Sequence, residues 1–175
     1  MTQISTWLQF ALQQMAAESY LDRILSGELQ LEQALRLGNN RVSGALASDP
    51  ILPGKTRMTD QQMIDFSARY DIVDHHANDA TGFSATLMQE RGTNNYTLSF
   101  RSTEYRNQSQ GGDWERDGQP GADGEIFFNG FALGQLVSME KYYQQLKANG
   151  VLPQGATLNV TDYSLGGHLA TVFTD

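Results

Sequence analysis

The chain has 175 residues, of which 39% are hydrophobic and 18% charged, a composition that suits one domain with a buried core. Its 8 Phe, 7 Tyr and 2 Trp exclude a disordered chain, which is poor in aromatic residues. Because the formal net charge is −8, the chain would repel a phosphate backbone, and we expect no binding to nucleic acid. The absence of cysteine excludes disulfides and cysteine metal sites.

Neither a membrane span nor a targeting segment is expected. No window approaches the roughly 18 consecutive apolar residues that a transmembrane segment needs. The first twenty residues have no basic leader before an apolar run, so we expect no N-terminal signal peptide of the usual kind. Residence in the cytoplasm and export by a signal elsewhere both stay open.

Helices are predicted for the first third of the chain. From Ile4 onward, apolar residues recur at steps of three and four, which predicts a helix to about Leu25, with Ser5 as a candidate N-cap. A second short helix is predicted over Leu29–Leu37. Residues 48–57 contain proline and glycine and predict a linker.

A third helix is predicted to begin after Thr59. Thr59 and Gln62 have the spacing of a capping box, in which each side chain accepts a hydrogen bond from the backbone N–H of the other residue. Met63, Phe66 and Tyr70 then form an apolar stripe, which is typical of a helix that packs on a core.

The second half of the chain predicts strands that alternate with helices. Residues 82–88 and 96–100 are rich in β-prone residues and predict a hairpin. The glycine-rich residues 111–124 predict a loop, residues 127–149 a helix, and residues 157–161 a short strand. This order favours a parallel sheet of the α/β class.

A serine lies directly after the last predicted strand. The nucleophile elbow of serine hydrolases has the pattern Gly-x-Ser-x-Gly between a strand and a helix, since the strained turn exposes the serine hydroxyl. Ser164 and Gly166 match this pattern, whereas Asp162 stands at the position of the first glycine. The alternative is an ordinary strand-to-helix turn in which Ser164 only caps the helix.

Residues 161–170 resemble the elbow of the class 3 lipases, an α/β-hydrolase family that acts on acylglycerols and related esters. The resemblance extends over residues 83–174, roughly half of the chain. Residues 98–103 are similar to a family strand that ends in Phe-Arg-Gly-Thr, whose last residue supplies part of the oxyanion hole. The resemblance therefore implies that role for Thr103, with Ser102 in place of the glycine.

We expect an α/β fold with an incomplete α/β-hydrolase-like sheet. Residues 1–80 would form a helical N-terminal segment, and residues 81–175 the N-terminal part of a lipase-like domain. The resemblance implies that Ser164 attacks the carbonyl of a lipid acyl ester, while the Leu165 N–H and Thr103 stabilise the oxyanion. The N-terminal part is similar to large secreted bacterial lipases with glycine-rich Ca²⁺-binding repeats, which implies secretion without an N-terminal signal peptide.

Eleven residues follow Ser164, and in α/β hydrolases the acid and then the histidine come after the serine. We therefore expect both partners to lie beyond Asp175, and this chain to be a truncated fragment with weak or no activity. The strand before the elbow would then have an uncovered edge, which favours self-association. The alternatives are a non-catalytic hydrolase-like module that binds a lipid or a partner, and an unrelated α+β structural domain.

Other titratable residues are assigned structural roles. His168 is expected to pack behind the elbow rather than to act as the base. His75 and His76 are favoured as part of a solvated loop over a metal site, because they lack the spacing of helical zinc ligands. We expect no cofactor in this chain, with Ca²⁺ only in the parent protein. Four acidic residues are favoured as a flexible loop over a calcium site: Asp113, Asp117, Asp123 and Glu125.

Overall fold

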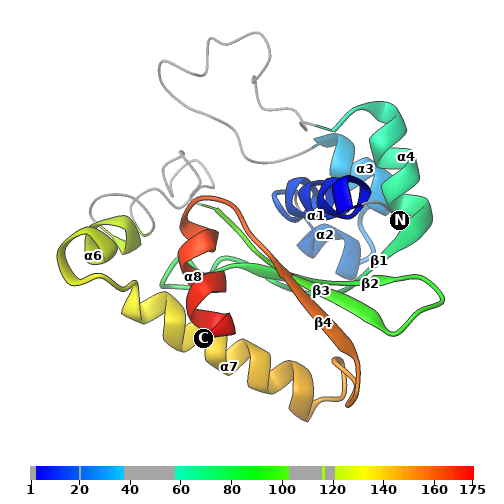
Figure 1. Ribbon diagram of the computed structural model, residues 1–175. Helices are drawn as coiled ribbons and strands as arrows, with labels where there is room; N and C mark the ends of the chain where they lie inside the picture. The colour runs from blue at the N-terminus through cyan, green and yellow to red at the C-terminus, as the bar shows by residue number, and fades with distance from the viewer. Residues whose placement is uncertain (1–2, 20, 38–57, 103–115, 117–120) are drawn as a thin grey trace, which may run out of the picture.

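The computed structural model describes residues 3–19, 21–37, 58–102, 116 and 121–175. These residues form helices on both faces of a small mixed sheet, which agrees with a fold of the α/β class (Figure 1). The linker expected over residues 48–57 lies outside the described residues, as does most of the loop expected over residues 111–124.

The sheet has four strands in the order β1-β2-β3-β4. The strands β1 (Tyr70–His76), β2 (Ala85–Glu90) and β3 (Asn95–Phe100) pair antiparallel, and β4 (Thr157–Thr161) pairs parallel with β3. The expectation of a parallel sheet therefore holds only for β3 and β4. Residues 91–94 connect β2 to β3, and so short a connection permits only an antiparallel pair.

The expectation of a solvated loop around His75 and His76 is wrong. Both residues belong to β1, which pairs with β2 and has a register shift between Ile72 and Asp74. Its polar residues stand on the outer strand of the sheet, where partial exposure is tolerated and sequence patterns resemble those of loops. One strand of the sheet thus lies within residues 1–80, which were expected to be helical.

The helices form two layers (Figure 1). On one face of the sheet lie α1 (Gln3–Ala17), α2 (Asp22–Leu25), α3 (Leu31–Leu37) and α4 (Asp60–Arg69). On the other face lie α7 (Leu133–Ala148) and α8 (Leu165–Thr174), and α6 (Ala122–Asn129) extends to one side beside α8.

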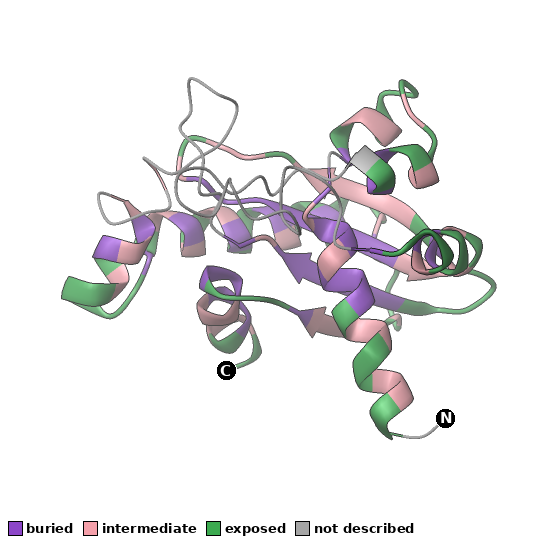
Figure 2. Cartoon of the chain, turned by 90° about the horizontal axis from the view of Figure 1, so that it is seen from above, coloured by how far each residue is buried: buried purple, intermediate pink, exposed green. Residues whose placement is uncertain are grey.

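Alternating residues of the central strands supply both cores, and these strands are the buried centre of the molecule in Figure 2. Leu98 and Phe100 of β3 pack with residues of α7 and α8, whereas Met88 of β2 packs with residues of α1 and α4. Thr97 and Ser99 alternate with Leu98 and are also buried. The face of β3 opposite α7 and α8 is therefore polar as well as buried.

The capping box at Thr59 is confirmed. The Thr59 hydroxyl oxygen accepts from the Gln62 N–H at 3.2 Å, and the Thr59 N–H donates to Gln62 Oε1 at 2.8 Å. The helix predicted to run to Leu25 is shorter than expected, because α1 ends at Ala17 and α2 is separate. Ser5 lies inside α1 and is not its N-cap.

The helix expected over residues 127–149 is two helices, α6 and α7. Gly130 ends α6 with a φ of 82°, a backbone conformation that glycine adopts without steric cost. Phe127 and Phe128, at the start of the predicted range, are 82% and 78% exposed and belong to no core stripe. None of the helices in the described ranges combines the length and hydrophobicity needed to cross a membrane.

Candidate active site

Ser164 occupies a tight corner between β4 and α8. Its backbone has φ 55° and ψ −119°, and it is the only described residue other than glycine with a positive φ. Such a conformation costs about 1–3 kcal/mol and persists where the surrounding structure imposes it. Ser164 is exposed, and its side chain makes no capping hydrogen bond to α8. The local geometry is therefore that of an elbow rather than of an ordinary serine N-cap.

Gly166 lets the first turn of α8 cross directly over the end of β3. A Cβ atom at this position would lie 2.8 Å from the Phe100 carbonyl oxygen and 3.4 Å from that of Arg101. The first distance is shorter than any normal Cβ contact, and the obstacle is backbone. Because β3 and β4 are parallel, with Ser99 beside Thr161, the segments that follow both strands meet at this edge.

Leu165 places a backbone donor beside the serine. Its side chain is buried with Ala122 and Ala132, which fixes the start of α8 against α6 and the segment before α7. In the part of the chain that the structure describes, the Leu165 N–H has no hydrogen-bond acceptor, as is usual in the first turn of a helix. Thr103, the other expected oxyanion donor, lies outside the described residues, and Ser102 before it is buried.

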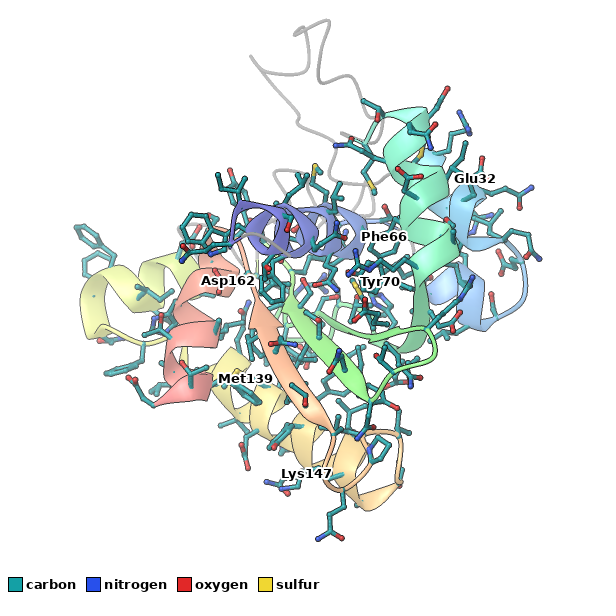
Figure 3. The ribbon with its side chains drawn as sticks, turned by 45° about the vertical axis from the view of Figure 1, so that its right-hand side comes forward. Glu32, Phe66, Tyr70, Met139, Lys147 and Asp162 are labelled. Carbon is teal, nitrogen blue, oxygen red and sulfur yellow. The ribbon has the colours of Figure 1, made fainter. Side chains whose placement is uncertain are left out.

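The Asp162 carboxylate lies against Gly167 in the first turn of α8. A Cβ atom at Gly167 would lie 3.1 Å from Asp162 Oδ1, so this carboxylate lies against the first turn of α8. Figure 3 shows Asp162 where β4 passes α1 and turns toward α8. Partial burial raises the pKa of Asp162 above its ordinary value. The acidic residue at the first glycine position of the elbow therefore lies beside the helix that follows Ser164.

The three histidines of the chain all make contacts away from the Ser164 hydroxyl. His168 Nε2 accepts from the Ala132 N–H at 3.5 Å, and its ring lies 5.8 Å from that of Phe131, so it packs behind the elbow as expected. His75 Nδ1 lies 2.9 Å from Thr86 Oγ1, and His76 Nε2 lies 3.4 Å from Asp79 Oδ2. In this chain no histidine stands in the position of a general base.

Helix α1 holds the ends of the two strands that lead to the site, a feature that sequence reasoning missed. Thr161 Oγ1 donates to the Phe10 carbonyl at 3.3 Å, which joins β4 to α1. Ser99 Oγ donates to Gln14 Oε1 at 2.7 Å, and Gln14 Nε2 donates to the Phe100 carbonyl at 3.2 Å. Gln14 lies among the apolar residues of the predicted first helix, and this was the available signal. A glutamine side chain that is buried must be hydrogen-bonded, so its position indicated a partner elsewhere in the fold.

The acidic residues before α7 are partly helical. Asp123 and Glu125 do not lie in a loop but in the first turn of α6. Carboxylates there interact favourably with the helix dipole. Asp113 and Asp117 lie outside the described residues. Within the described ranges there is no group of three or more acidic, histidine or cysteine residues arranged to hold a metal ion.

Comparisons of the chain with protein-family models, with curated proteins and with solved structures found no match.

Proposed function

We propose that Ser164 is the nucleophile of a serine hydrolase that acts on carboxylic esters of the lipid acyl type. The observation that carries the proposal is the strained, exposed and uncapped conformation of Ser164 between a strand and a helix. Strain of this kind gathers at functional sites, where the surrounding structure maintains it. The class 3 lipase motifs around Ser164 and Thr103 point to the same chemistry.

In the proposed reaction Ser164 Oγ attacks the ester carbonyl while a general base takes its proton. The resulting oxyanion accepts hydrogen bonds from the Leu165 N–H and from Thr103. The alkoxide leaving group takes the proton from the base, and water then releases the acid from the acyl-enzyme in the same way. Because no histidine of this chain contacts Ser164, the proposal requires a base and an acid from outside the described residues.

Exposed aromatic side chains beside the elbow support an apolar acyl group as substrate. Phe127 and Phe128 are exposed on α6, and their rings lie 5.0 Å apart. The preceding residue, Ile126, packs on the cluster that contains Leu165, which places α6 beside the elbow. Figure 2 shows the exposed outer end of α6. An acyl chain that left Ser164 toward α6 would meet apolar surface.

Ester turnover by the complete gene product tests the proposal. We expect hydrolysis of p-nitrophenyl butanoate and octanoate, and a fall of more than about 10³-fold in kcat for Ser164→Ala. The matched control is Ser26→Ala, which removes an exposed hydroxyl at the end of α2 and should leave kcat unchanged. Equal turnover by S164A and S26A would show that Ser164 is not the nucleophile.

A non-catalytic binding module is the second candidate, and one observation favours it. The Asp162 carboxylate lies on the first turn of α8, close to where an oxyanion would form, and a like charge there disfavours that intermediate. If this reading is right, the complete gene product binds octanoate esters without hydrolysing them. Asp162→Gly would then leave turnover at background, whereas it should raise kcat if the elbow is catalytic.

A further inference from the structure

The segment that follows β3 is held by a half-buried carboxylate from a distant part of the sequence. Glu18, directly after α1, accepts from the Ser102 N–H at 3.1 Å and from Gln14 Nε2 at 3.2 Å, both at Oε1. Its other oxygen lies 3.9 Å from Arg101 Nε, and the two side chains are 14% and 8% exposed. A carboxylate in such a place loses hydration, so these contacts must compensate for that loss.

Gln14 and Glu18 together contact each of the four residues 99–102, where the chain leaves β3. They are four residues apart, which places them on the same side of the chain as α1 ends. Gln14 bonds to Ser99 and to the Phe100 carbonyl, and Glu18 contacts Arg101 and the Ser102 N–H. This set of contacts fixes the chain as it leaves the sheet, immediately before Thr103.

We propose that Glu18 is a positioning residue for the oxyanion-binding segment, an inference that rests on the proposed function. Binding the Ser102 N–H fixes the peptide plane between Arg101 and Ser102, directly after the end of β3. Arg101 offsets the charge of Glu18, so the carboxylate adds little negative potential where the oxyanion forms. In this role Glu18 acts through its contacts with Arg101 and Ser102 and not by contact with the substrate.

Two conservative variants distinguish the position of the Glu18 oxygen from the charge of its carboxylate. Glu18→Gln retains an oxygen that reaches the Ser102 N–H but loses the charge, whereas Glu18→Asp retains the charge and withdraws the oxygen. We expect E18D to lower kcat for p-nitrophenyl butanoate by about tenfold or more with little change in KM, since small misplacements of oxyanion donors are costly. We expect the kcat of E18Q to remain within about threefold of that of the unmodified protein. The glutamine oxygen still accepts from the Ser102 N–H, so the segment that follows β3 keeps its position.

The matched control is Glu90→Gln, at the opposite end of the sheet. Glu90 pairs with Arg69 at 2.7 Å and accepts from Asn95 Nδ2 at 3.2 Å, so the same chemical change is made far from the elbow. E90Q should lower the melting temperature and leave kcat unchanged. All variants are made in the complete gene product, with the folded fraction measured by circular dichroism alongside the kinetics.

The outcomes distinguish the two proposals. If S164A shows that turnover does not depend on Ser164, the proposed function fails and this inference with it. If turnover depends on Ser164 but E18D retains full kcat, or E18Q falls as far as E18D, only the positioning role is wrong. Should E18D fail to fold, Gln14→Met removes the second donor to Glu18 while retaining an apolar side chain of similar length. Q14M should lower kcat severalfold, and an unchanged kcat overturns the inference.

Discussion

Three residues of the elbow have separate physical tasks. Ser164 adopts a backbone conformation that L-residues rarely adopt, Gly166 permits the helix to cross β3, and Gly167 lies against the Asp162 carboxylate. The sequence motif identified the first two positions, because the elbow pattern carries its steric reason with it. It did not predict how Asp162 is accommodated, since that depends on the distance between two side-chain positions across the turn.

The strain at Ser164 can be measured as stability. Glycine adopts a φ of 55° without a Cβ collision, whereas alanine retains the collision and lacks the hydroxyl. We expect Ser164→Gly to be more stable than Ser164→Ala by about 1 kcal/mol, after the greater flexibility of glycine in the unfolded chain is allowed for. Urea unfolding followed by circular dichroism measures the difference. Equal midpoints for the two variants would mean that the corner is not strained.

Gly166 and Gly167 form a matched pair for testing the close approach of α8 to β3. Gly166→Ala places a methyl group against the Phe100 carbonyl, which is backbone, and should destabilise the fold by about 2 kcal/mol or more. Gly167→Ala meets only the end of the Asp162 side chain, which can turn away, and gains helix propensity of up to about 1 kcal/mol. We expect thermal unfolding to show a loss for G166A alone. Equal effects at both positions would contradict the described crossing.

Among the helices and strands, local sequence patterns predicted several elements correctly. They could not predict contacts between residues that are far apart in the chain. The capping box before α4, the hairpin of β2 and β3, and β4 each depend on residues close together in the chain. β1 was missed because its polar residues occupy an outer strand. The contacts of α1 with β3 and β4 join residues more than eighty positions apart, so no local pattern could indicate them.

β1 contributes a dependence of stability on pH through His75. Burial, with the nearby charges of Arg101 and His76, lowers the pKa of His75 from 6.5 to about 3. The unfolded chain binds a proton at this residue near pH 6.5, and the folded chain does so only near pH 3. The contribution of neutral His75 to stability is therefore complete above pH 6.5 and is lost as the pH falls, by up to about 1.4 kcal/mol per pH unit.

His75→Gln removes this titration and retains a polar group that reaches Thr86. We expect the free energy of unfolding of H75Q to depend less on pH between about 6 and 4 than that of the unmodified chain. Urea titrations at several pH values provide the comparison. An identical slope for both proteins would mean that His75 is protonated in the folded state over this range.

In the molecule as a whole, the helices cover both faces of the sheet, and β4 is one of its two outer strands. β4 has β3 on one side and, among the described residues, no strand on the other. Three residues of β4 are only half-buried, although the elbow follows directly from it. Pairing of this edge with another chain stays a prediction. Composition and element order indicated an α/β class, and the predicted hairpin indicated one antiparallel pair, whereas the pairing of β1 with β2 was not predicted.

Covalent labelling of Ser164 tests the central claim most directly. The complete gene product is treated with a fluorophosphonate, digested, and mapped by mass spectrometry, with urea-unfolded protein as the reference. We expect one phosphonate adduct, on Ser164, in the folded protein and none in the unfolded protein. If Ser164 is not labelled in the folded protein, or is labelled equally in the urea-unfolded protein, this corner is not a nucleophile elbow.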